Sequence, residues 1–239
     1  MSIDGVKALT FDVFGTVVDW RSCVIREAQA LGARLGVTLD WPAFVDRWRY
    51  EGYIGEIGRI IKGEREFTTT DNLHRTKLDA LLAEHSITVS KEDADDFNRA
   101  WHRLDPWPDS VAGLGRLKQK YIISTLSNGN VALLVDMAKY AKLPWDCILS
   151  ADLVGAFKPD PQCYLRGAAF LGLEPHQVMM VAAHKADLRA AAAAGLRTAY
   201  IPRPLEAGPS RKIDLSHDAA FDFNADSLLE LADKLACPE

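Results

Sequence analysis

Six polar side chains that could carry out nucleophilic and acid–base chemistry lie in four separate segments of the sequence, each close behind an apolar run. In chain order they are Asp12, Ser127, Asn128, Lys158, His184 and Asp187. A carboxylate can act as a nucleophile or a base, and a lysine lets neighbouring carboxylates stay ionised. Each residue alone has an ordinary structural explanation, because aspartate is a common helix cap and Ser-Asn-Gly a common turn. Their joint order along the chain favours one shared site.

The apolar runs before these residues predict a parallel β-sheet. The expected strands are residues 6–13, 121–126, 147–150, 178–183 and 198–201. Helical patterns separate the later runs, and strands that alternate with helices are typical of βαβ units. In an open parallel sheet the ligand crevice lies beyond the carboxyl ends of the strands, so the polar side chains are expected to converge on one edge.

The segment between the first two runs has a different pattern. From about residue 20 to about residue 104 the apolar spacing is helical, and no convincing strand interrupts it. The sequence therefore predicts an α/β fold, with a parallel-sheet core made of residues 1–18 and 105–239. A helical domain, residues 19–104, is inserted after the first strand.

Composition excludes several classes of function. The net charge of −5 gives no electrostatic case for binding nucleic acid or an anionic membrane. The amino-terminal MSIDGVK lacks the layout of a signal peptide, and no apolar run approaches the roughly 20 residues of a membrane span. The four cysteines are scattered and are interpreted as free thiols. We expect a cytoplasmic protein with no nucleic-acid or membrane partner.

Four segments carry a family resemblance: DVFGT, LSNG, FKPDPQCY and VAAHKADLRAAAAAG. They resemble the loop motifs of the haloacid dehalogenase superfamily, and the helical block resembles its cap domain. The likeness spans nearly the whole chain and is strongest to the type II L-2-haloacid dehalogenases. It implies a doubly wound, Rossmann-like core with a helical cap, and a hydrolase that converts short 2-haloalkanoic acids to 2-hydroxy acids without a cofactor. It also implies a small 2-halocarboxylate as substrate and, because family members are often dimers, a homodimer.

The resemblance assigns roles to the residues of the core. Asp12 attacks C2 of the substrate, halide leaves, and water then attacks the resulting aspartyl ester. Asp187 is the candidate that positions or deprotonates this water, and Lys158 is expected between the two carboxylates. Thr16 and Tyr164 match family positions that support the site by hydrogen bonds.

Phe14 stands where phosphatases of the superfamily carry a second aspartate that protonates the leaving alcohol. A halide needs no proton, so this acid is dispensable in a dehalogenase. Phe14 can instead wall off a small apolar pocket; the alternative is core packing in a phosphatase that has lost activity. Ser127 and backbone N–H groups near Val13 and Phe14 are expected to hold the substrate carboxylate.

The halide is expected to meet a donor from the helical domain. Arg49, in the segment WRYEGY, resembles the family arginine that contacts the leaving group, with Trp48 beside it and Asn128 as a second donor. The alternative for Arg49 is an ordinary solvated helix charge. Aromatic walls favour short substrates, and we hypothesise that Arg49 and a protonated His184 allow fluoride to be expelled from fluoroacetate.

The fourth motif departs from the family pattern. Ala182, Ala183 and His184 stand where the dehalogenases commonly have Ser-Ser-Asn, so the serine and asparagine that assist ester hydrolysis are missing. His184 either replaces the asparagine or is a packed residue. No acidic residue occupies the phosphatase metal position, and Lys158 competes with a cation, so no metal is predicted.

Three other functions stay open. A phosphatase of the same superfamily is disfavoured by Phe14. A hydrolase that opens a strained ring on a small carboxylate shares the mechanism and is not separated by sequence. A non-catalytic binding protein is disfavoured by the presence of Asp12, Ser127, Lys158 and Asp187 together.

Overall fold

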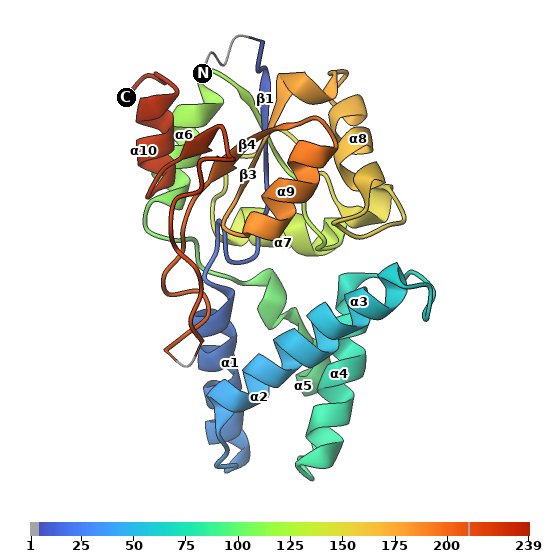
Figure 1. The fold of residues 1–239 in the computed structure, drawn as a ribbon. Coiled ribbons are helices and arrows are strands. Elements are labelled where there is room, and N and C mark those ends of the chain that lie inside the picture. Colours follow the sequence, from blue (N-terminus) through green and yellow to red (C-terminus); the bar gives the residue numbers. More distant parts are fainter. Residues whose placement is uncertain (1–4, 210) are drawn as a thin grey trace.

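A five-stranded parallel sheet lies at the centre of one half of the molecule (Figure 1). The computed structural model describes residues 5–209 and 211–239. The strands are β1 (Ala8–Phe11), β2 (Ile122–Thr125), β3 (Val178–Ala182), β4 (Arg197–Tyr200) and β5 (Phe223–Asn224). Their spatial order is β2-β1-β3-β4-β5, and every neighbouring pair is parallel. The predicted α/β class is confirmed, and β1 is buried on both faces, as its nearly continuous apolar run predicts.

Two details of the sheet differ from the prediction. The run 147–150 is extended but joins β2 only through the isolated bridges Ser124–Cys147 and Ser127–Ser150. The hydroxyl of Thr125 donates to Leu149 O at 2.7 Å and accepts from Leu149 N at 2.9 Å, so a side chain satisfies backbone groups that a ladder would otherwise pair. The two-residue strand β5 was not predicted, because two residues show no periodicity.

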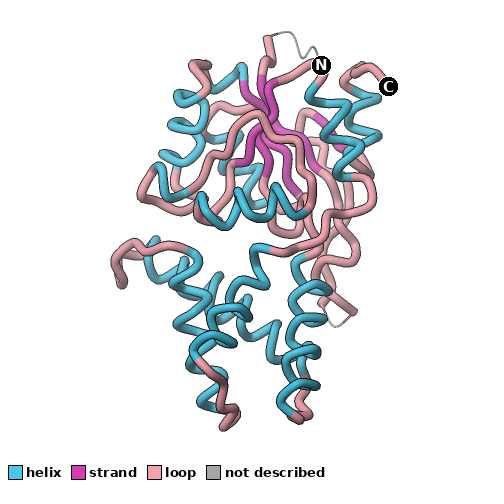
Figure 2. Tube along the Cα trace, turned by 180° about the vertical axis from the view of Figure 1, so that it is seen from behind, coloured by secondary structure: helices cyan, strands magenta, loops and turns pink. Residues whose placement is uncertain are grey.

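Helices flank the sheet (Figure 2). They are α6 (Ser110–Lys118), α7 (Val131–Tyr140), α8 (Pro161–Phe170), α9 (Lys185–Ala193) and α10 (Leu228–Lys234), with short 3₁₀ turns η3 (Ala151–Leu153) and η4 (Pro175–Gln177). Crossovers through helices are what parallel strands need, because a tight hairpin cannot join them. Among the described residues no helix is both long and apolar enough to cross a bilayer.

The segment after β1 forms a separate group of helices below the sheet in Figure 1. It contains α1 (Trp20–Leu35), α2 (Trp41–Arg47), η1 (Trp48–Gly55), α3 (Glu56–Ile61), α4 (Thr70–Glu84), α5 (Lys91–Asn98) and η2 (Arg99–His102). No strand occurs in residues 19–104, all of which are described. The chain leaves and returns side by side, since Val18 bridges Pro106 and Asp19 N donates to Asp105 O at 3.0 Å. The predicted boundaries fall at this crossing; the division into two domains stays a prediction.

Phe14 links the hydrophobic interior of the two halves. Its buried ring lies in the turn after β1, with ring centroids 5.9 Å from Tyr53 and 6.3 Å from Trp101 in the helical segment. Trp101 in turn stacks on Trp20, the first residue of α1, at 6.0 Å. Aromatic contacts therefore hold the helices over the carboxyl edge of the sheet.

Candidate active site

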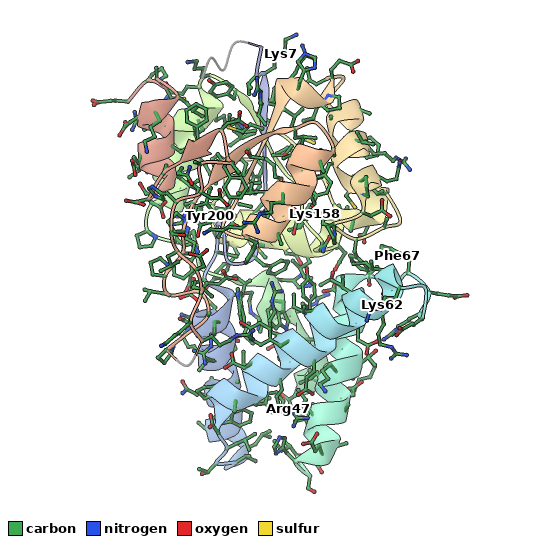
Figure 3. All side chains as sticks on the ribbon, in the orientation of Figure 1. Lys7, Arg47, Lys62, Phe67, Lys158 and Tyr200 are labelled. Atoms are coloured by element: carbon green, nitrogen blue, oxygen red, sulfur yellow. The ribbon has the colours of Figure 1, made fainter. Side chains whose placement is uncertain are left out.

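A cavity of about 590 Å³ lies between the carboxyl edge of the sheet and the helical segment. Its charged and polar lining includes Asp12, Arg49, Asn128, Lys158, Tyr164, His184, Asp187, Glu206 and Arg211. Most of these side chains come from the loops after β1, β2, β3 and β4 and from the first turn of α9. Lys158 lies in the loop before α8, Tyr164 lies in α8, and Arg49 lies in η1 opposite them. In Figure 3 Lys158 lies at the side of the sheet layer that faces the helices. Of the residues expected at the site, four do not line this cavity: Val13, Thr16, Trp48 and Ser127.

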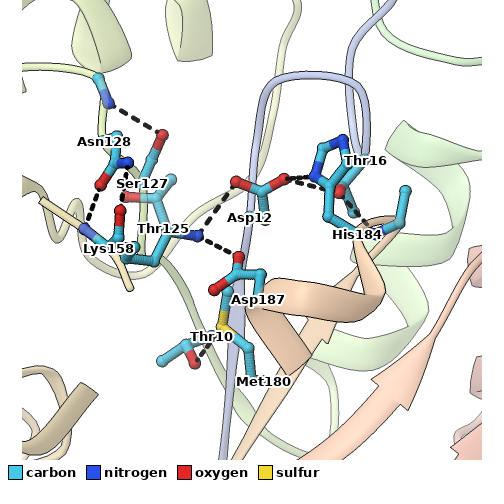
Figure 4. A network of polar contacts seen from close by, with 12 residues as sticks. Thr10, Asp12, Thr16, Thr125, Ser127, Asn128, Lys158, Met180, His184 and Asp187 are labelled. Carbon is cyan, nitrogen blue, oxygen red and sulfur yellow. Dashed lines mark hydrogen bonds and ion pairs between the residues drawn. The ribbon is translucent and has the colours of Figure 1, made fainter. Parts of the chain in front are cut away.

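Lys158 joins the two carboxylates at the centre of the site (Figure 4). Its Nζ donates to Asp12 Oδ1 at 3.1 Å and to Asp187 Oδ2 at 2.5 Å, which is the placement the sequence analysis expects. Tyr164 donates to the other oxygen of Asp187 at 2.5 Å. Burial disfavours the ammonium, but the charges of Asp12 and Asp187 outweigh it and raise the pKa of Lys158. The lysine therefore keeps its charge and allows both aspartates to ionise side by side.

The other oxygen of Asp12 accepts two hydrogen bonds. Thr16 Oγ1 donates to Oδ2 at 2.9 Å, and His184 Nδ1 lies 2.9 Å from the same atom. The Thr16 hydroxyl is fixed by Ala183 N, which donates to it at 2.8 Å. Burial acts to raise the pKa of Asp12, but the charges of Lys158 and His184 outweigh it and lower that pKa. Asp12 is consequently a carboxylate across the neutral range, ready to act as a nucleophile.

His184 is bonded on both sides, and its second partner is a residue that the sequence analysis did not single out. Nε2 lies 3.0 Å from Glu206 Oε1, so both ring nitrogens face carboxylates and both must carry hydrogen. Burial opposes the charge, yet Glu206 and Asp12 raise the pKa of His184 to about 10. His184 lines the cavity and bonds Asp12, which favours a role in the site over simple packing; that role stays a prediction. Nothing in the sequence marks Glu206, because it lies in an irregular loop after β4.

Two residues expected to contact the substrate, Ser127 at its carboxylate and Asn128 at the halide, make hydrogen bonds within the protein instead. Ser127 Oγ accepts from Gly129 N at 3.1 Å inside its own turn. Asn128 does line the cavity, but its amide pairs with the backbone of Lys158, at 2.7 Å from Lys158 N and 3.2 Å to Lys158 O. This pair ties the loop after β2 to the loop that carries the lysine, so Asn128 positions Lys158.

Arg49 is buried, with 5% of its surface exposed, and its guanidinium lies among aromatic rings. Its Cζ is 4.2 Å from the centroid of Tyr53 and 5.1 Å from those of Phe14 and Trp20. Nη1 has no hydrogen-bond partner among the described residues. The alternative of a solvated helix charge is therefore wrong. Cation–π contacts hold the charge in place while a donor stays free for an anion in the cavity.

Trp48 does not border the cavity, which corrects the expectation that it flanks the halide. Its side chain is fully buried and Nε1 donates to His74 O at 2.8 Å. The reason is local: Trp48 and Arg49 lie in η1, a π-helical stretch, and successive residues of a helix point in different directions. Trp48 packs inside the helical segment while Arg49 turns to the cavity.

The residues present do not suggest a metal site. Within residues 5–209 and 211–239 no group of three or more histidine, cysteine, aspartate or glutamate side chains is arranged to hold a metal ion. The ammonium of Lys158 stands between the two aspartates, where a cation bound to both would need to be. That the reaction needs no metal stays a prediction.

Comparison with known proteins gives consistent similarities. Residues 6–195 match the haloacid dehalogenase-like hydrolase family. The fold matches a crystal structure of a defluorinating L-2-haloacid dehalogenase with a TM-score of 0.93 and 48% identity, over 97% of this chain and 96% of the other. A second L-2-haloacid dehalogenase structure matches with a TM-score of 0.93 and 46% identity, over 97% and 99% of the two chains. An (S)-2-haloacid dehalogenase 4A from Burkholderia cepacia is 30% identical over 84% of this chain and 85% of its own.

Proposed function

Because the chain belongs to the haloacid dehalogenase-like hydrolase family, we propose that it hydrolyses the carbon–halogen bond of short L-2-haloalkanoic acids to give 2-hydroxy acids. One observation carries the proposal. The carboxylate of Asp12 faces a cavity whose opposite wall holds Arg49, a buried cation with an unpaired donor. A nucleophile on one side and an anion site on the other are what a displacement of halide requires.

The first step is displacement at carbon. Asp12 Oδ1 accepts a single hydrogen bond from the described residues, whereas Oδ2 accepts two, so Oδ1 has more freedom to form a new bond. Oδ1 attacks C2 from the side opposite the halogen, the C2–halogen bond breaks, and the halide leaves toward Arg49. The product of this step is an ester between Asp12 and the substrate.

The second step is hydrolysis of that ester at the carbonyl carbon of Asp12. Asp187 accepts from both Lys158 and Tyr164, and these bonds orient it beside Asp12. A water near Asp187 gives up its proton there and attacks. Since the bond to C2 is never broken in this step, the configuration at C2 is inverted once over the whole reaction.

Fluoroacetate is the most demanding substrate we propose. Fluoride is small and strongly hydrated, so its departure needs close, charged donors. Arg49 supplies the donor that has no partner among the described residues. The imidazolium of His184 lines the same cavity and adds positive charge there, while its two N–H groups bond Asp12 and Glu206. The 48% identity to a structure described as defluorinating supports this assignment. The aromatic rings of Phe14, Trp20 and Tyr53 line the cavity around Arg49, and such bulky walls support a preference for haloacetates over longer acids.

The test is an ion-selective electrode assay with chloroacetate and fluoroacetate, alongside phosphate release from p-nitrophenyl phosphate. We expect halide release and no phosphate release. L-2-Chloropropionate should give D-lactate, and Arg49→Lys should lose more fluoride release than chloride release. Phosphate release without halide release would support the phosphatase instead, and retained configuration at C2 would exclude the two-step scheme. A homodimer and a cytoplasmic location are also proposals, and light scattering on the purified protein tests the first.

A further inference from the structure

We propose that Glu206 is a positioning residue for ester hydrolysis: it holds the His184 ring so that Nδ1–H is aimed at Oδ2 of Asp12. This inference rests on the proposed two-step reaction. After Oδ1 has been alkylated, Oδ2 is the carbonyl oxygen of the ester. His184 then acts, together with Thr16, as a donor to the negative charge that forms on that oxygen.

The hydrogen-bond pattern around the ring supports this role. Glu206 accepts from Nε2 through both of its oxygens, at 3.0 and 3.1 Å, and so fixes the plane of the imidazole. Its own position is held by Trp20, whose Nε1 donates to Oε1 at 3.2 Å. Two carboxylates on opposite sides of one ring leave a single arrangement of hydrogens, in which both nitrogens donate. The neutral ring would leave one carboxylate without a donor.

The backbone next to the His184–Glu206 pair leaves room for the Glu206 carboxylate because residue 15 is a glycine. A Cβ atom on Gly15 would lie 2.0 Å from Glu206 Oε1, so any side chain at residue 15 would displace Glu206. The loop that carries Glu206 is anchored by Arg203, whose Nε donates to Thr16 O at 2.8 Å and whose other nitrogens bind Asp109 at 2.7 and 3.0 Å. The turn after β1 and the loop after β4 thus pack against each other.

Hydrolysis of the ester begins with the attack of water on Asp12. Water forms a bond to Cγ of Asp12 and gives one proton to Asp187, while the C=O electron pair moves onto Oδ2 between Thr16 and His184. When that pair returns, the Cγ–Oδ1 bond breaks and the 2-hydroxy acid leaves, taking the proton from Asp187. Asp12 is regenerated with one oxygen from water and loses its remaining proton to solvent. His184 donates throughout and is not consumed.

Ionisation of Glu206 is consistent with this arrangement. Burial opposes its charge, but the charge of His184 outweighs burial and lowers the pKa of Glu206. Five other charged residues line the cavity: Asp12, Lys158 and Asp187 of the core, Arg49 of η1, and Arg211 of the loop after β4. Among these, Asp12 and Glu206 are the two carboxylates that hydrogen-bond the ring.

The experiment compares Glu206→Gln with wild type in rapid-quench assays on chloroacetate. The amide keeps the shape but removes the charge. We expect a first-turnover burst of chloride near the wild-type rate, followed by a steady-state rate lower by roughly 10- to 100-fold. Intact-mass analysis of the quenched protein should show the ester accumulating on Asp12. The alkaline limb of the steady-state profile should move to lower pH, and Glu206→Asp should recover part of the rate.

The matched control is Asp214→Asn. Asp214 lies farther along the same loop and bonds Lys185 at 2.6 Å, with a mostly exposed side chain. Its steady-state rate should equal that of wild type. Glu206→Gln with a wild-type steady-state rate and no ester, or with burst and steady state slowed equally while its melting temperature is unchanged, would overturn the proposal. If Glu206→Gln does not fold, the same criteria apply to Glu206→Asp. Absence of chloride release from wild type would instead refute the proposed function on which this inference rests.

Discussion

Two histidines of this protein make the same pattern of contacts in two different regions. His184 lies between Asp12 and Glu206 at the cavity. His102, in η2, lies between Asp71 of α4 and Asp136 of α7, at 2.9 and 2.8 Å. In each case both ring nitrogens face carboxylates, and in each case the pKa of the histidine is raised although burial opposes its charge.

The surroundings of the two rings separate their roles. The His184 side chain keeps 39% of its surface exposed and faces the cavity, whereas that of His102 keeps 8% and does not line it. Asp71 is further bonded by Asn130, which donates to it at 2.8 Å from the loop after β2. His102 therefore joins the helical segment to the core, and His184 joins the nucleophile to a loop. In the proposed mechanism, the same ion pairing serves assembly at His102 and chemistry at His184.

The largest expected effect comes from replacing Asp12, the proposed nucleophile and one of the two carboxylate partners of His184. Asp12→Asn should lower the dehalogenation rate by at least about 10⁴-fold, because an amide is a far poorer nucleophile than a carboxylate. A single turnover of wild type in ¹⁸O-labelled water should put the label into Asp12 and not into the product. Label in the first product would show that water attacks the substrate directly. Asp12 would then not be the nucleophile, and His184 would have no different role from His102.

Next in size is the difference between the two histidines in the pH profile. The pKa of His184 is raised, so its cation persists below pH 10 and is lost as the pH rises through about 10. Wild-type activity should fall over that range. His184→Asn should remove this alkaline limb and lower the rate by roughly 10²-fold. His102→Gln should keep both the limb and, within about threefold, the rate.

If His102→Gln moved the alkaline limb as far as His184→Asn does, the limb would belong to the whole electrostatic field and not to the cavity. If neither variant moved it, a different group would titrate there. Profiles of all three proteins should be measured at a fixed ionic strength, because salt screens exposed charges.

The two histidines should rank in the opposite order in their contributions to stability, with His102 contributing more than His184. The expected effect is smaller than the effects on rate. His102→Gln removes two charge-assisted hydrogen bonds, one to Asp136 of the core and one to Asp71 within the helical segment, and should lower the free energy of unfolding by about 1 to 3 kcal/mol. Because the folded pKa of His102 is raised above 6.5, this contribution is complete below that pH and is lost as the pH rises through the folded pKa.

The difference in midpoint between wild type and His102→Gln should therefore be larger at pH 6 than at pH 9 in urea titrations. The control is His217→Gln, since His217 lies on the surface and bonds one carboxylate, that of Asp226, among the residues that the structure describes. A difference that grows toward alkaline pH would mean that His102 is neutral in the folded protein.

The smallest expected effect is that of a chelator. Lys158 supplies the positive charge between Asp12 and Asp187, so exhaustive treatment with EDTA should leave the rate of chloride release unchanged. Activity lost on chelation and restored by Mg²⁺ would contradict the proposed chemistry. The assay is the same electrode measurement before and after dialysis.

Much of the site could be predicted from the sequence, because the edge of the sheet at which a residue lies depends on the direction in which the parallel strands run. Parallel strands end at one edge, so residues that follow them, such as Asp12, Asn128 and Asp187, had to meet there. Lys158 was placed between the aspartates through the family resemblance, and the structure has it there. The strands β1 and β3 were predictable for a similar local reason, since buried strands need unbroken apolar runs.

Only the tertiary structure decided which way the side chains face. Arg49 and Trp48 are neighbours in sequence, yet one enters the cavity and the other the helical interior, because packing selects the direction. Glu206 reaches His184 only because Gly15, far away in the chain, has no side chain to block it. Periodicity records which faces are buried, whereas a contact between two irregular loops depends on the positions of both, and those exist only once the sheet has assembled.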